Sequence, residues 1–362
     1  MKTTFFTKEY VSLAGISIGL MVICSILGEI LPSVPSWPSG VFAWFAALLL
    51  ASQLSKSQIF QIGILLLIGI VTLSVGIKLG ANPRWLRLLD NNVVLLSMLA
   101  AVSFLRLVTL QSREARRECP QGARAYWQTM ITVALFGAII NMSAPILIAD
   151  RVSKGKKLEL FQAKSIVRAF VGGPTWSPFF AGMAVVLTYV ADAHFLIVMA
   201  FGLPFAALGL ALVIIEAMWR SPGDVSKFEG YPMTASSLWL PSFLVVSVLV
   251  GHTFLPHASI LTIIALSALV ISSIGLSFSK GVRGAGNQLR QHIQKGLPEM
   301  VNELVLFLAA GILAIGLQTL VSATQMSLPF GEGFNATYAT MLLAGMVLLS
   351  SLGVHAIITV SY

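Results

Sequence analysis

Charged side chains are scarce in this sequence. Lys, Arg, Asp and Glu together make up 10% of the 362 residues, whereas hydrophobic residues make up 57%. A soluble domain carries about 25% charged residues, which supply the polar surface that water requires. The composition therefore excludes an ordinary soluble domain and indicates a membrane protein.

Alternating strands of about ten residues, which a membrane β-barrel requires, are also lacking. Long apolar runs take their place, and about 20 residues are enough for a helix to cross a hydrocarbon core of roughly 30 Å. We expect an all-α, polytopic transmembrane fold with about 10–11 membrane segments. The expected segments lie near residues 11–31, 40–54, 59–79, 91–110, 126–149, 166–191, 195–219, 236–255, 258–279, 299–325 and 337–361.

Signatures of catalysis are missing as well. The sequence has no P-loop of the kind that an ATP-driven pump needs, and no cluster of His, Cys, Asp or Glu has metal-ligand spacing. Acidic residues number only 14, which is sparse for a pair of catalytic carboxylates. Cys24 and Cys119 show no pairing pattern. We expect a protein that is not an enzyme and has no cofactor, apart from a coupling Na⁺ or H⁺.

The net charge of +9 arises mostly from cations in short loops between apolar spans, at 111–124, 150–168, 220–229 and 280–295. Such loops are typical of the cytoplasmic face and do not indicate nucleic-acid binding. They predict a multi-pass protein of the cell membrane, of the bacterial inner-membrane type, with a cytoplasmic N-terminus. Lys2 and Lys8 could also begin a signal peptide. However, the apolar run after them continues to Leu31 without an evident cleavage site, so we expect a retained first helix.

The basic loops 111–124 and 150–168 flank a single apolar span, 126–149. One crossing cannot have both ends in the cytoplasm. A re-entrant hairpin with its tip near Asn141–Pro145 resolves the conflict, because irregular backbone is tolerated at membrane depth where it is buried or lines a cavity. The alternative is an ordinary helix with a proline kink and one misassigned loop.

Two pairs of segments match at a nearly constant offset of about 210 residues, which indicates an internal repeat. The run from Asn92 resembles the run from Asn302, and the run from Thr129 resembles that from Thr340. Counting spans predicts opposite membrane entry for the two copies, as in inverted-repeat transporters. We expect four regions: N-terminal transmembrane helices (1–84), a first repeat with a hairpin and an unwound helix (85–220), linking helices (221–295) and an incomplete second repeat (296–362).

Polar and small residues interrupt two apolar spans of the first repeat. One interruption contains Asn141, Ser143 and Pro145, and the other, Gly172–Pro178, contains Gly173, Thr175 and Ser177. Open backbone and hydroxyl groups can bind an anion at half-helix N-termini or Na⁺ at freed carbonyls. We predict that these six residues bind substrate. The alternative is a kinked helix whose hydroxyls bond back to their own turn.

A third interruption, in the second repeat, adds Ser351, Gly353, His355 and Thr359 to the predicted substrate site. His355 lies deep in an apolar segment, and an ionisable group there is a functional hypothesis by default. It could relay a proton or contact substrate. A structural histidine with satisfied hydrogen bonds is the alternative.

The order of these features resembles the ion transporter superfamily, which includes divalent-anion/sodium symporters, citrate transporters and arsenite-type exporters. Asn141–Ser143 resembles the tip of that family's first hairpin, Gly172–Pro178 its unwound helix, and Ser350–Thr359 the tip of its second hairpin. The resemblance covers residues 85–362 and implies an elevator-like inverted-repeat transporter, often a homodimer.

The function expected from the sequence is a secondary active transporter of a small, anionic solute, coupled to Na⁺ or H⁺. Its expected partners are that solute, the lipid bilayer and a second copy of the chain. The alternative is a non-transporting membrane subunit or scaffold of an envelope complex.

Overall fold

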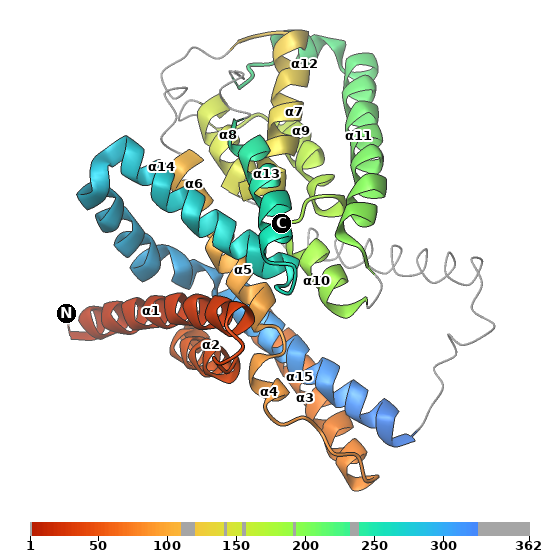
Figure 1. Ribbon diagram of the computed structural model, residues 1–362. Coiled ribbons are helices and arrows are strands. Elements are labelled where there is room, and N and C mark those ends of the chain that lie inside the picture. The colour runs from red at the N-terminus through yellow and green to blue at the C-terminus, as the bar shows by residue number, and fades with distance from the viewer. Residues whose placement is uncertain are drawn as a thin grey trace. The chain divides into compact units, whose positions relative to one another are not determined.

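The computed structural model describes residues 2–109, 120–140, 143–153, 157–190, 193–231 and 239–324 (Figure 1). Within these ranges the chain is helical, and its only strand-like feature is an isolated antiparallel bridge between Gln121 and Glu229. The all-α class predicted from the apolar runs is therefore confirmed. Internal contacts divide the chain into two units, Met1–Leu66 with Arg84–Ile312, and Leu67–Pro83 with Leu313–Tyr362.

The helices of the described residues fall into three consecutive parts of the chain. The first part of the chain contains α1 (Lys2–Ile30), α2 (Trp37–Leu50), the 3₁₀ helix η1 (Ala51–Gln53), α3 (Lys56–Lys78), α4 (Arg87–Asp90), α5 (Val93–Ser103) and α6 (Leu105–Thr109). The middle part contains α7 (Ala123–Ile140), α8 (Ser143–Ser153), α9 (Leu160–Phe170), the 3₁₀ helix η3 (Gly173–Thr175), α10 (Ala181–Tyr189), α11 (Phe195–Arg220) and α12 (Pro222–Lys227). The last part contains α13 (Trp239–Phe254), α14 (Ile260–Gln291), the π-helix η5 (His292–Gly296), the 3₁₀ helix η6 (Leu297–Met300) and α15 (Val301–Thr324).

Five helical segments among the described residues are long and apolar enough to cross a membrane. They are Glu9–Ile30, Lys56–Lys78, Arg87–Val108, Phe195–Arg220 and the continuous run Ile260–Thr324. In Phe195–Arg220 only 6% of the most apolar window is buried within the protein. Apolar surface of that extent is not stable in water and indicates contact with lipid. The protein is thus a helical membrane protein.

Several predicted spans differ from the observed helices. The span 40–54 corresponds to α2, which has only 14 residues, and 91–110 is divided between α5 and α6. The interval 280–295, expected to be a loop, is helical as far as Gln291 and continues as η5. That expectation was wrong because Gly281, with φ +71°, interrupts α14 at a single kink, and the basic residues after it form a second helical segment instead of a loop.

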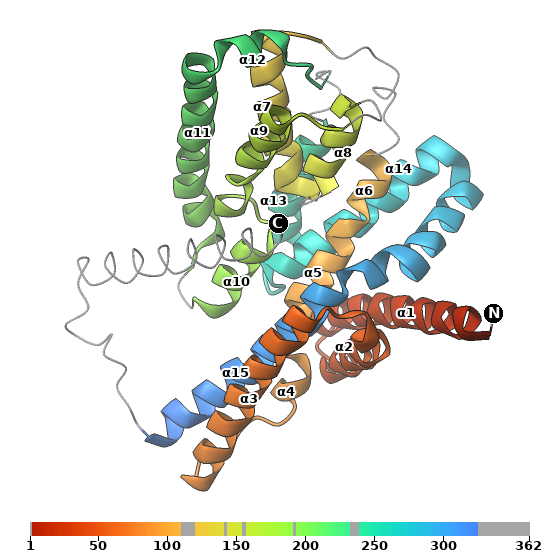
Figure 2. The ribbon, with the colours of Figure 1, turned by 180° about the vertical axis from the view of Figure 1, so that it is seen from behind.

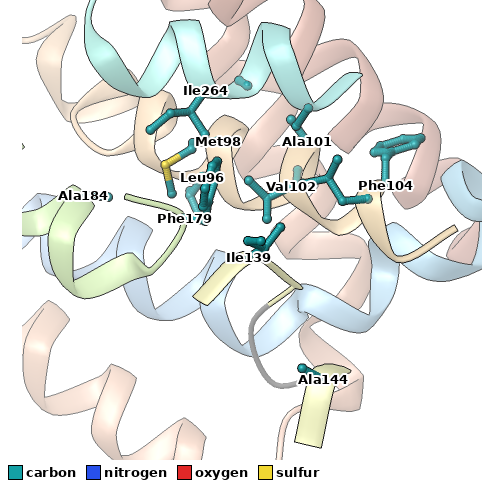
Figure 3. Close-up of a cluster of buried hydrophobic side chains, with 14 of the residues drawn as sticks. Leu96, Met98, Ala101, Val102, Phe104, Ile139, Ala144, Phe179, Ala184 and Ile264 are labelled. Carbon is teal, nitrogen blue, oxygen red and sulfur yellow. The ribbon is translucent and has the colours of Figure 1, made fainter. Parts of the chain in front are cut away.

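Helix α5 lies at the centre of the first unit. In the segment Arg87–Val108, which contains α5, 61% of the most apolar window is buried, and α5 contacts α1, α7, α10 and α14. Figure 3 shows side chains from both sides of α5, including Leu96 and Val102, gathered with residues of α7, α8, α10 and α14. The buried Asn92 side chain also donates to the Phe307 carbonyl of α15 at 2.8 Å. The core is therefore organised around this one helix.

In the second unit, α3 and α15 meet through small residues. A Cβ on Gly316 would collide with the Gly69 carbonyl, and a Cβ on Gly76 would lie 2.9 Å from the Thr319 carbonyl carbon. Small residues allow helix backbones to approach closely, which is how helices associate where no hydrophobic effect drives them together.

Helices α7, α8 and α9 run forward, back and forward again. The start of α9 lies beside the start of α7, because Tyr126 stacks on Phe161 with ring centroids 5.7 Å apart. The ends of these two helices also meet, since a Cβ on Gly137 would lie 2.7 Å from the Phe170 ring. Since α7 and α9 are parallel, α8 must return the chain between them, and α8 contacts both (Figures 1 and 2). Helices α7 and α8 thus form a helical hairpin.

Candidate functional site

The expected span 166–191 is interrupted between Phe170 and Ala181. Gly172 and Gly173 weaken helix formation, and Pro174 lacks the N–H that a continuing helix needs. The chain forms the single turn η3, in which Trp176 N donates to Gly173 O at 3.3 Å, and then runs irregularly to α10. We call residues 171–180 the break.

Ser177 connects the break to the end of α7. Its side chain is fully buried (0% exposed), its hydroxyl donates to the Ala138 carbonyl, and it accepts from Phe179 N at 3.2 Å. Ala138 belongs to the last turn of α7, where carbonyls lack intrahelical donors. The Ser177 hydroxyl therefore satisfies a helix end and does not face an open space.

Thr175 connects the break to α11. Its Oγ1 lies 2.7 Å from the Gly172 carbonyl oxygen and 3.5 Å from that of Gly202. A Cβ on Gly202 would collide with the Thr175 carbonyl, so the two segments approach as closely as backbones can. The Thr175 side chain is exposed and lines a cavity.

The end of the hairpin meets the break beside α5. Pro145 and Ala144 are buried at the start of α8, whose first residue is Ser143. Figure 3 shows Ile139 and Phe179 beside the α5 side chains Leu96 and Val102, with Ala144 farther from them at the start of α8. The structure thus brings Gly173 and Ser177 to the end of α7, with Thr175 on the α11 side, whereas Pro145 is placed only at the buried start of α8. The other predicted site residues, Asn141, Ser351, Gly353, His355 and Thr359, lie outside the described residues.

A cavity of about 450 Å³ adjoins the break, between α7, α9 and α11. Its lining is mostly apolar, with Leu135, Leu203 and Leu210 among its walls, and its polar side chains are Arg168 at one end and Thr175 and Trp176 at the other. No group of three or more potential metal ligands occurs among the described residues. This cavity suits an apolar group better than a hydrated ion.

A second cavity, of about 460 Å³, has a charged lining and shares Arg168 with the first. Glu216 accepts from Arg168 and, at 3.1 Å, from Arg220 on its own helix, while Lys164 and Asp224 complete the charged wall. No role was predicted for these residues from the sequence. The i,i+4 spacing of Glu216 and Arg220 was a visible signal, whereas the pairing with Arg168 depends on the packing of α9 against α11.

Ser103 and the buried His292 form a partly buried polar pair that the sequence did not predict. Ser103 Oγ lies 2.7 Å from His292 Nε2 and 2.6 Å from the Ala100 carbonyl oxygen. Since a hydroxyl carries one hydrogen, the serine donates to one of these two atoms, and the imidazole tautomer decides which. The pair fastens α5 to η5, beside the edge contact of His292 with Phe104.

Comparisons with protein-family models, with curated proteins and with solved structures found no match to this chain. The fold therefore defines a class of protein and no family. The protein is a helical membrane protein in which a helical hairpin contacts an interrupted helix.

Proposed function

We propose that this protein is a secondary active transporter of a small anionic solute, coupled to Na⁺ or H⁺, with its substrate site where the hairpin meets the break. The observation that carries the proposal is the contact between the end of α7 and the break, made by Ser177 and the Ala138 carbonyl beside α5. Interrupted helices that meet a hairpin supply open backbone groups within the membrane, as substrate and ion sites of such transporters require.

Two helices begin in this region. α8 starts at Ser143, and α10 starts at Ala181 after the break. Helix N-termini carry partial positive charge and unpaired N–H groups, which favour an anion. The resemblance to the ion transporter superfamily adds the elevator-like movement and the homodimer to the proposal.

Transport in proteoliposomes tests the proposal. Purified protein is supplied with labelled succinate, citrate, phosphate or sulfate under an inward Na⁺ or H⁺ gradient. For the transported anion, Ser143→Ala or Thr175→Ala should reduce uptake roughly tenfold or more, the value of one hydrogen bond to a charged group. Thr188→Ala is the matched control, because its hydroxyl bonds the Ala184 carbonyl at 2.7 Å within α10. Normal uptake by both site variants would show that neither the break nor the hairpin tip belongs to the substrate site.

One observation favours a second candidate, a non-transporting membrane subunit or scaffold. The Thr175 and Ser177 hydroxyls already contact backbone carbonyls, and the cavity beside them is largely apolar. A scaffold of this kind would give no gradient-dependent uptake of any of the four anions in the same proteoliposomes.

A further inference from the structure

The two cavities described above lie next to each other along α9 and α11. Arg168 lines both, with the apolar cavity towards the break and the charged cavity towards the start of α9 and the end of α11. Both lie within one unit of the structure, and α7, α9 and α11 contact one another (Figures 1 and 2). The site therefore has an apolar end and a charged end.

The apolar end is open to the surroundings. Phe205 and Leu203 on its α11 wall are 68% and 47% exposed. Gly209 leaves a gap in that wall, since a Cβ there would meet nothing within 4 Å. A groove with apolar walls that opens to the membrane accommodates a hydrocarbon chain without leaving polar groups unsatisfied.

The charged end favours an anion. It has more cations than carboxylates, because Lys164, Arg168 and Arg220 face Glu216 and Asp224. Glu216 accepts from both arginines, but a guanidinium has five N–H donors and retains some for a second acceptor. Ser165 accepts from the Tyr126 hydroxyl at 3.4 Å, so its own hydroxyl hydrogen can point into the cavity.

We propose that this site binds an anionic phospholipid, with its phosphate against Lys164, Arg168 and Arg220 and an acyl chain in the apolar groove beside the break. The charge and the shape of the site favour an anionic phospholipid over other ligands. A small hydrated anion gains nothing from the apolar end, and a neutral lipid gains little from the cations. The predicted cytoplasmic position of 150–168 and 220–229 also places the charged end at the leaflet where anionic lipids collect.

Thermal unfolding of the purified protein in detergent tests the proposal. Added dioleoyl phosphatidylglycerol should raise the midpoint by about 3–5 °C, because a ligand that binds only the folded state stabilises it. Dioleoyl phosphatidylcholine has the same chains with a zwitterionic headgroup and should give a clearly smaller rise. Glycerol 3-phosphate has the anionic group without chains and should give none.

Four variants test which residues cause the rise in the unfolding midpoint. Lys164→Gln with Arg168→Gln should abolish the advantage of phosphatidylglycerol over phosphatidylcholine, while Arg283→Gln, which removes an exposed cation of α14, should preserve it. Gly209→Leu should fill the groove and abolish the response to both lipids. Gly63→Leu is its control, because a Cβ there also meets nothing within 4 Å.

Three results would overturn the proposal. Equal unfolding midpoints with the two lipids would show that the site does not recognise the anionic headgroup. A rise with glycerol 3-phosphate equal to that with phosphatidylglycerol would identify a site for free anions instead. A normal lipid response in Gly209→Leu would remove the acyl groove. None of these results depends on whether the protein transports a solute.

Discussion

The Ser177 hydroxyl joins two backbone groups that the helices leave unpaired, Ala138 O and Phe179 N. Ser177→Ala would leave both buried and unsatisfied, at a cost of about 1–3 kcal/mol for each group before relaxation. We expect a loss of about 2–3 kcal/mol in the free energy of unfolding, measured by denaturant or thermal unfolding in detergent.

Ser247→Ala is the control for that measurement. The Ser247 hydroxyl donates at 2.8 Å to the Leu244 carbonyl within α13, so its removal leaves no group without a helical partner. A change within about 0.5 kcal/mol is expected. Equal losses in the two variants would contradict the bridging role of Ser177.

Among the helices, α11 contains two glycines in opposite situations. At Gly202 a Cβ would collide with the Thr175 carbonyl, whereas at Gly209 a Cβ meets nothing within 4 Å. Gly202→Ala should force α11 away from the break and cost about 1–3 kcal/mol, lowering the unfolding midpoint. Gly209→Ala should leave it unchanged or raise it, since alanine favours helix by up to about 1 kcal/mol.

Both alanine variants gain the same helix propensity. The difference between their unfolding midpoints therefore measures the effect of the close approach of α11 to the break. The same pair reports on the break in transport assays, if α11 positions Thr175. Midpoints that agree within error would mean that α11 does not need to pack against the break in the way the structure shows.

The helices were predictable to different degrees, for physical reasons. Long apolar runs predict the helices α1, α3 and α11, and Gly172–Pro178 predicts an interruption, because both depend on local backbone and solvent preferences. The hydrogen bonds that build the site do not depend on local preferences. Ser177 meets Ala138, and Arg168 meets Glu216, across 39 and 48 residues of sequence, and such pairings depend on how separate helices pack.

In the first unit as a whole, three basic segments lie at one end. The backbone bridge of Gln121 to Glu229 joins the segment before α7 to the segment after α12. The Tyr126–Phe161 stack adds the start of α9. α11 runs antiparallel to α9, since Gly202 lies beside Thr175 and Glu216 beside Arg168, so α11 begins at the opposite end.

This arrangement predicts that the three basic segments lie on the same side of the membrane. That is impossible if residues 126–149 cross the membrane once. Arg124→Cys, Lys157→Cys and Lys227→Cys, each introduced after Cys24→Ser and Cys119→Ser, should react with a membrane-impermeant maleimide only in permeabilised cells. All three native side chains are exposed, so access depends on the side of the membrane. His194→Cys, at the exposed start of α11, should react in intact cells. Labelling of Lys157→Cys from outside would replace the hairpin with a single crossing, because only a crossing separates the two ends of that span.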